Sequence, residues 1–224
     1  MKVGMFLKIK AAIFDMDGTL VDSLMLWNVL WSRLGREFLN DESFVPSVED
    51  DKKVRTLTLK EAMALIHKNY GIGASGEELL EIANALITDF YQNDVKLKDG
   101  VKEFLETMKK RGVKMCVASA TAPELVEMAM EHCDIKKYFL KLFSCGEIEK
   151  GKEEPDIFLM AAEFLGEDIA NTCVFEDSLV AISTAHAIGM QTVGIYDKYN
   201  FGQEKIREIA AKYIAEGETL MKLI

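Results

Sequence analysis

Asp15 and Asp17 are the two residues of this sequence best placed to do chemistry, because they stand one residue apart at the end of an apolar run. Alternate residues of an extended chain point to the same side, so both carboxylates could face one ligand. Gly18 follows them and frees the backbone to turn sharply. Such a pair can bind a divalent cation, or divide into a nucleophile and a proton donor. The alternative is a solvated Asp-Asp-Gly turn, since a motif this short also occurs without a function.

Groups that could bind a ligand also stand at the ends of three later apolar runs. They are the Ser119 hydroxyl and the backbone amides of Ala120 and Thr121 after the run 113–118, Lys152 after the run 141–144, and Glu176 and Asp177 after the run 171–175. If these runs are strands of one parallel sheet, their carboxyl ends share the edge at which ligands bind. The sequence therefore predicts one polar site built from four strand ends.

The acidic side chains of this predicted site would repel one another unless a cation joined them; they are Asp15, Asp17, Glu176 and Asp177. Mg²⁺ suits such oxygen ligands and commonly binds a substrate phosphate as well. The Ser119 hydroxyl and the Ala120 amide could hold phosphate oxygens near a helix N-terminus, and Lys152 could neutralise both phosphate and carboxylate. Each residue also has a purely structural interpretation: Ser119 as a helix N-cap, Lys152 as a surface lysine, and the acidic pair as the start of a helix.

The elements that must position these residues alternate between strand and helix. Apolar runs predict strands at 8–14, 113–118, 141–144, 171–175 and 191–195, and helical spacing predicts helices at 101–110, 123–132, 156–165 and 179–188. Such alternation indicates an α/β fold with a parallel sheet.

A helical block interrupts this pattern directly after the first strand, from residue 23 to about residue 91. Helices are predicted at 57–68 and 77–90, whereas the acidic stretch 40–51, which contains Pro46, is predicted to be a loop. We expect the block to be an inserted cap over residues 23–94, with the α/β core formed by residues 1–22 and 95–224.

The glycine-rich stretch 71–76 matches a dinucleotide-binding pattern, but that pattern requires a preceding strand, and here a helix precedes it. We interpret Gly71 as the end of one helix and Ser75 as the N-cap of the next, with Glu78 completing a capping box.

Composition narrows the possible partners and compartments. The 224 residues carry a net charge of -10, which argues against nucleic acid as a main partner, since nucleic-acid binding normally needs a basic face. No apolar run approaches the roughly 18 residues that span a bilayer, and no signal peptide is recognised, so no membrane partner is expected. The four cysteines form no C-x-x-C pair, which favours a reducing cytoplasm over a disulfide framework. The oligomeric state stays open.

At these residues the chain resembles the haloacid dehalogenase-like (HAD) hydrolase superfamily. Its first motif, D-x-D-G-T-L-x-D-S, is similar to residues 15–23, its second to 117–121, its third (G-K-P-x-P-D) to 151–156, and its fourth to 174–178. The helical insert after the first motif is similar to the β-phosphoglucomutase-like phosphatase branch. The resemblance implies a Rossmann-like parallel sheet with an all-helical cap.

The resemblance also implies roles for the site residues. Asp15 would be the nucleophile that forms an aspartyl-phosphate, and Asp17 would protonate the leaving alcohol and then activate water. Asp15, the backbone carbonyl of Asp17, Glu176 and Asp177 would surround Mg²⁺, while Ser119, Ala120 and Lys152 would hold the phosphoryl group. The expected function is Mg²⁺-dependent hydrolysis of a small phosphorylated metabolite, such as a sugar phosphate.

Two alternatives stay open: a phosphosugar mutase with the same intermediate, and a non-catalytic module that binds phosphorylated metabolites. The mutases that the chain resembles have a histidine four residues after the serine of the first motif, and Trp27 occupies that position here, which favours hydrolysis. Trp27 could instead line the substrate pocket or pack in the cap core. Arg55 belongs to a basic cluster that could meet an anionic substrate or form a solvated face.

Overall fold

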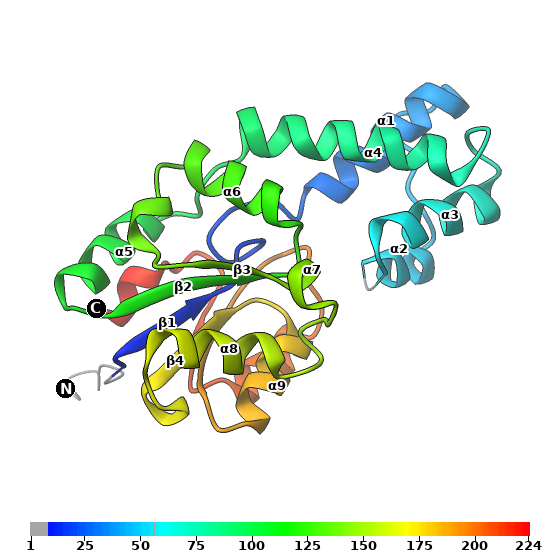
Figure 1. Ribbon diagram of the computed structural model, residues 1–224. Helices are drawn as coiled ribbons and strands as arrows, with labels where there is room; N and C mark the ends of the chain where they lie inside the picture. Colours follow the sequence, from blue (N-terminus) through cyan, green and yellow to red (C-terminus); the bar gives the residue numbers. More distant parts are fainter. Residues whose placement is uncertain (1–8, 56) are drawn as a thin grey trace. The chain divides into compact units, whose positions relative to one another are not determined.

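The computed structural model describes residues 9–55 and 57–224. The chain divides into two compact units (Figure 1). The core unit is formed by the described residues of Met1–Leu24 together with Val95–Ile224, and the helical unit is Met25–Asp94. In the part of the chain that is described, no helix is both long and apolar enough to cross a membrane.

Six parallel strands form the sheet of the core unit, in the order β3-β2-β1-β4-β5-β6. The strands are β1 (Ala11–Phe14), β2 (Lys114–Ser119), β3 (Leu142–Ser144), β4 (Thr172–Glu176), β5 (Gln191–Ile195) and β6 (Lys212–Ile214). The predicted α/β fold with a Rossmann-like parallel sheet is therefore confirmed. From β1 the chain adds β2 and β3 on one side of the sheet and then returns to add β4, β5 and β6 on the other. A ligand is expected to bind where the direction changes, at the carboxyl end of β1.

Helices cover both faces of this sheet. They are α5 (Val101–Lys110), α6 (Pro123–His132), α7 (Cys145–Ile148), α8 (Asp156–Leu165), α9 (Leu179–Ala187) and α10 (Gln203–Ile209), with short 3-10 turns η2 (Lys136–Tyr138), η3 (Ile169–Asn171) and η4 (Leu220–Leu223). Figure 1 shows α5 and α6 over one face and α8 and α9 over the other.

β1 is buried on both faces, which explains its unbroken apolar sequence. Ile13 packs into a cluster that includes Phe158 of α8. Phe14 points the other way, where its ring stacks on Phe175 with centroids 4.4 Å apart and meets Phe104 of α5 edge-on. This double burial fixes the strand whose end carries Asp15.

The helical unit packs around its own apolar centre, formed by residues such as Trp31, Leu34, Met63 and Ile66. Its elements are α1 (Leu26–Leu39), α2 (Val48–Val54), α3 (Leu59–Tyr70), α4 (Gly76–Asp89) and a π-helical turn η1 (Phe90–Asp94).

The prediction that residues 40–51 form a loop is wrong in its last part, because α2 begins at Val48. The Ser47 side chain caps this helix by accepting the Asp50 backbone N–H at 3.1 Å. Three acidic residues occupy the first turn, where the helix dipole favours negative charge, so the acidity that suggested a loop stabilises a helix start.

The glycine-rich stretch is a helix connection, as predicted. Gly71 ends α3 in the left-handed conformation, and Ser75 caps α4 by accepting the Glu78 backbone N–H at 3.3 Å. The predicted capping box is wrong in one detail, because Glu78 Oε2 accepts the N–H of Ala74, one residue before the cap.

Candidate functional site

Asp15 is the first residue after β1 and lies at the carboxyl edge of the sheet. Its backbone N–H donates to the Phe175 carbonyl at 2.9 Å, so the ladder with β4 continues into the site. The side chain is only 6 % exposed. The buried strand and this last hydrogen bond leave Asp15 little freedom.

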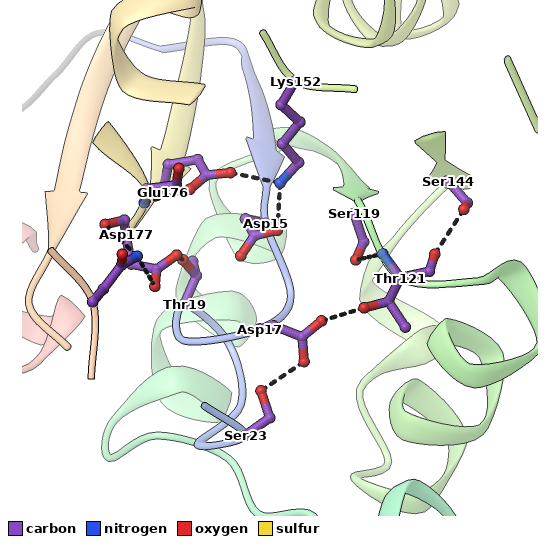
Figure 2. Close-up of polar contacts among 12 residues, drawn as sticks. Asp15, Asp17, Thr19, Ser23, Ser119, Thr121, Ser144, Lys152, Glu176 and Asp177 are labelled. Carbon is purple, nitrogen blue, oxygen red and sulfur yellow. Dashed lines mark hydrogen bonds and ion pairs between the residues drawn. The ribbon is translucent and has the colours of Figure 1, made fainter. Parts of the chain in front are cut away.

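Lys152 joins Asp15 to the acid at the end of β4 (Figure 2). Its ammonium forms an ion pair with Asp15 Oδ1 and donates to Glu176 Oε1 at 2.5 Å. The second Glu176 oxygen, Oε2, accepts the Ser178 backbone N–H at 2.8 Å. All three side chains are buried, so Lys152 is not a surface lysine but lies between two acidic side chains.

Asp177 completes the acidic cluster and is 3 % exposed. Its Oδ1 accepts from the Thr19 hydroxyl at 3.4 Å, and its Oδ2 accepts from the Asn200 amide at 2.8 Å. Gly18 lies against the same carboxylate, since a Cβ built there would overlap Asp177 Oδ2. The turn after β1 and the end of β4 therefore meet closely at Asp177.

These acids fit a divalent cation. Asp15, Glu176 and Asp177 each offer one carboxylate oxygen, and the three oxygens lie within 4.8 Å of one another. When all three carboxylates are ionised they outnumber the one lysine, and a hard cation such as Mg²⁺ would balance the excess negative charge.

Burial and the crowding of acidic groups shift the pKa values of the charged side chains at the site. Burial, together with the charges of Glu176 and Asp17, raises the pKa of Asp15 from 3.8 to about 8, although Lys152 opposes the shift. Burial and the neighbouring Glu176 and Asp15 charges also raise the pKa of Asp177 well above its usual value. For Lys152, burial disfavours the charged form, but the two acids outweigh it and raise its pKa. Lys152 is therefore charged at neutral pH.

Asp17 points away from this cluster toward a second polar group (Figure 2). Its Oδ1 accepts from the Ser23 hydroxyl at 2.6 Å, and its Oδ2 accepts from the Thr121 hydroxyl at 2.7 Å. Two donors thus fix the carboxylate from opposite ends. Asp17 therefore has two hydroxyl partners, whereas Asp15 has the Lys152 ammonium.

The loop after β2 is fixed by hydroxyl groups. Ser119 is fully buried, and its Oγ accepts the Thr121 backbone N–H at 3.0 Å. Ser144, at the end of β3, donates to the Thr121 carbonyl at 2.7 Å. The N-cap of α6 is Ala122, so the alternative of Ser119 as a helix N-cap is wrong. Ala120 lies between Ser119 and Thr121 and is exposed.

Trp27 and Arg55 lie together in the helical unit. The Arg55 guanidinium lies 5.8 Å from the Trp27 ring centroid, and its Nε donates to Asp51 Oδ2 at 3.0 Å. Asp51 also accepts from the indole of Trp31 at 2.9 Å. Arg55 is thus partly neutralised within its own unit, and a contact of either residue with substrate stays a prediction.

Thr121 was predicted to lie at the site but was given no role there, whereas Ser23 and Asn200, which contact Asp17 and Asp177, were not named as site residues. Ser23 was visible as the last residue of the first motif, and Thr121 as the polar residue that follows Ser119 and Ala120. Asn200 has no such signal, because it lies in a loop after β5 and reaches Asp177 only through the fold.

Comparisons with known proteins identify relatives of the whole chain. The family model for "haloacid dehalogenase-like hydrolase" matches residues 9–189. "Phosphorylated carbohydrates phosphatase" of Thermotoga maritima is 24 % identical over 94 % of this chain and 96 % of its own length. "Hexitol phosphatase B" of Escherichia coli K12 is 28 % identical, with 83 % of each chain covered. A "putative beta-phosphoglucomutase" structure from Thermotoga maritima has a TM-score of 0.77 at 23 % identity, over 92 % of this chain and 94 % of its own.

Proposed function

The chain belongs to the haloacid dehalogenase-like hydrolases, and we propose that it is a Mg²⁺-dependent phosphatase that acts on a small sugar phosphate through an aspartyl-phosphate. The family and the hydrolase class were both predicted and are confirmed. The observation that carries the proposal is the convergence of Asp15, Glu176 and Asp177, with oxygens within 4.8 Å, beside the ammonium of Lys152.

In the first half-reaction, a carboxylate oxygen of Asp15 attacks phosphorus, and the bond from phosphorus to the substrate oxygen breaks. Asp17 gives a proton to the departing alcohol, so no alkoxide is released. Lys152 and the donors of the loop 119–121 face the phosphoryl oxygens, whose spread charge needs electrostatic stabilisation.

In the second half-reaction, Asp17 takes a proton from water, and the water oxygen attacks the phosphorus of the aspartyl-phosphate. The bond to Asp15 breaks, inorganic phosphate leaves, and both aspartates return to their starting forms. Splitting the displacement in this way replaces one difficult step by two easier ones. The hydroxyls of Ser23 and Thr121 hold Asp17 for both proton transfers.

Asp15, Glu176, Asp177 and the Asp17 backbone carbonyl are the groups that would hold Mg²⁺. A bound cation supplies positive charge, which keeps the Asp15 carboxylate ionised despite its raised pKa and attracts the substrate phosphate.

The sugar-phosphate class is supported by the names of the relatives, two of which refer to carbohydrate or hexitol phosphates. We propose that Met25–Asp94 serves as a cap and that Trp27 and Arg55 help to select the substrate. Trp27 in place of a histidine favours hydrolysis over mutase activity. All four cysteines are free thiols, which accords with a reducing cytoplasm as the place of action.

The test is phosphate release from a panel of sugar phosphates and one aryl phosphate, with Mg²⁺ or with a chelator. We expect turnover that requires Mg²⁺ and disappears in Asp15→Asn. Turnover that survives the chelator or the substitution would overturn the proposal. Conversion of a sugar 1-phosphate to its 6-phosphate would identify a mutase, and binding without turnover would identify a non-catalytic module.

A further inference from the structure

Asn200 contacts Asp177 at the candidate site, but the proposed chemistry gives it no role. It follows β5 in the loop that leads to α10, and it lies beyond the residues that the family model matches. Its amide Nδ2 donates both to Asp177 Oδ2 at 2.8 Å and to the Asp177 backbone carbonyl at 3.0 Å. One side chain therefore holds the acid and its backbone together.

The loop that carries Asn200 is itself fixed. Asp197 is 4 % exposed, and it accepts from the Lys98 ammonium at 2.8 Å and from the Tyr199 backbone N–H at 2.9 Å. The Asn200 backbone N–H donates back to the Asp197 carbonyl at 3.2 Å. A partly buried ion pair and two backbone hydrogen bonds thus hold the loop that presents the Asn200 amide to Asp177.

Hydrogen bonding limits how Asp177 can meet a cation. Its Oδ2 is held by Asn200 at 2.8 Å and its Oδ1 by Thr19 at the longer distance of 3.4 Å, so Asn200 is the stronger constraint. Glu176 is constrained in the same way, with Lys152 on Oε1 and the Ser178 N–H on Oε2. A carboxylate with donors on both oxygens is suited to offer a cation one oxygen rather than two.

This limit distinguishes two common cations. Mg²⁺ takes six ligands in a near-ideal octahedron and keeps several waters, so single oxygens suffice. Ca²⁺ takes six to eight oxygens and commonly uses carboxylates through both oxygens. A site that denies two-oxygen contact therefore penalises Ca²⁺ more than Mg²⁺.

We propose that Asn200 is a positioning residue that holds Asp177 to a one-oxygen contact and so makes the site prefer Mg²⁺ over Ca²⁺. The proposal rests on the proposed function only in placing a divalent cation at Asp15, Glu176 and Asp177. It adds a determinant of cation selectivity from outside the four sequence motifs.

The test is calorimetric titration of the full chain with MgCl₂ and with CaCl₂, without substrate. We expect Asn200→Ala to lower the ratio of Mg²⁺ affinity to Ca²⁺ affinity by about tenfold, the scale seen when partners of metal ligands are removed. Asn93→Ala is the matched control, because Asn93 Nδ2 donates to Asp89 Oδ1 at the same 2.8 Å within the helical unit. It should leave the ratio unchanged.

Asn200→Asp is the second variant, in case Asn200→Ala does not fold. It keeps an oxygen for the Phe201 N–H, which Asn200 Oδ1 accepts at 2.8 Å, but it removes the donor to Asp177. It should also lower the ratio, because Asp177 Oδ2 loses the donor that holds it. An unchanged ratio in the folded variants, or an equal change in Asn93→Ala, would overturn this inference but not the proposed function. Failure of the wild-type chain to bind either cation would overturn the metal site as well.

Discussion

Gly18 lies in the turn after Asp17, and both its backbone and its missing side chain matter to Asp177. Its φ is +74°, and a Cβ there would overlap Asp177 Oδ2. We predict that Gly18→Ala displaces this acid and weakens Mg²⁺ binding at least tenfold, the scale of losses around metal ligands. Titration calorimetry measures the affinity.

Gly112→Ala separates backbone strain from the collision in this prediction. Gly112 has a nearly identical φ of +75°, but an added Cβ would meet nothing within 4 Å. Both variants should lose about 1 kcal/mol or more of stability from the left-handed conformation. If Gly112→Ala also lost Mg²⁺ affinity, or if Gly18→Ala kept it, the collision would not be the cause.

The sequence was enough to predict which residues of the first, third and fourth motifs come together, because strand ends of a parallel sheet share one edge. Asp15, Glu176, Asp177 and Lys152 do meet there. Asn200 could not be predicted, because its contact with Asp177 spans 23 residues and depends on the path of a loop. Apolar periodicity places strands and helices but carries no information about how a loop folds back. The catalytic roles of these residues stay predictions.

Whole elements were predicted best where the chain is strongly patterned. The helices at 101–110, 123–132 and 156–165 have the predicted ends, because apolar positions recur at helical spacing and Pro123 and Pro155 mark two of the starts. β6 and α10 were not predicted. β6 has three residues, of which only Ile214 is buried, so its sequence shows almost no apolar run.

β5 contains a polar group that opposes folding. Thr192 is 1 % exposed, and among the described residues none offers its Oγ1 a hydrogen bond. We predict that Thr192→Val stabilises the protein by about 1 kcal/mol, because a buried hydroxyl without a partner costs its full desolvation. Urea unfolding measures the change.

Thr172 on the neighbouring strand β4 provides the opposite case for the Thr192 prediction. It is fully buried, but its Oγ1 donates to the Asp168 carbonyl at 3.0 Å. Thr172→Val should therefore destabilise by about 1 kcal/mol. A destabilising Thr192→Val would show that its hydroxyl has a partner, such as a buried water.

At the scale of the whole molecule, the acidic site should set how stability depends on pH. Asp15 has a pKa of about 8 in the folded chain against 3.8 ordinarily, and the pKa of Asp177 is raised as well. Between pH 4 and pH 8 the folded state, without a cation, thus keeps protons that the unfolded state has released. The slope of the free energy of unfolding against pH is proportional to the number of protons bound by the unfolded state minus the number bound by the folded state. This difference is negative here, so stability falls as pH rises.

We therefore predict that the free energy of unfolding, measured in a chelator, decreases from pH 5 to pH 8, and that Mg²⁺ cancels most of this loss. A cation binds the ionised acids, so its stabilisation grows with pH through linkage. Asp15→Asn removes one of the shifted groups and should flatten the slope. The exposed acid Asp134, whose pKa is lowered to about 2 mainly by hydrogen bonds from Lys137 and Lys102, titrates below this range and does not mask the effect. Equal stabilisation by Mg²⁺ at pH 5 and pH 8 would mean that the ion does not displace protons from these carboxylates.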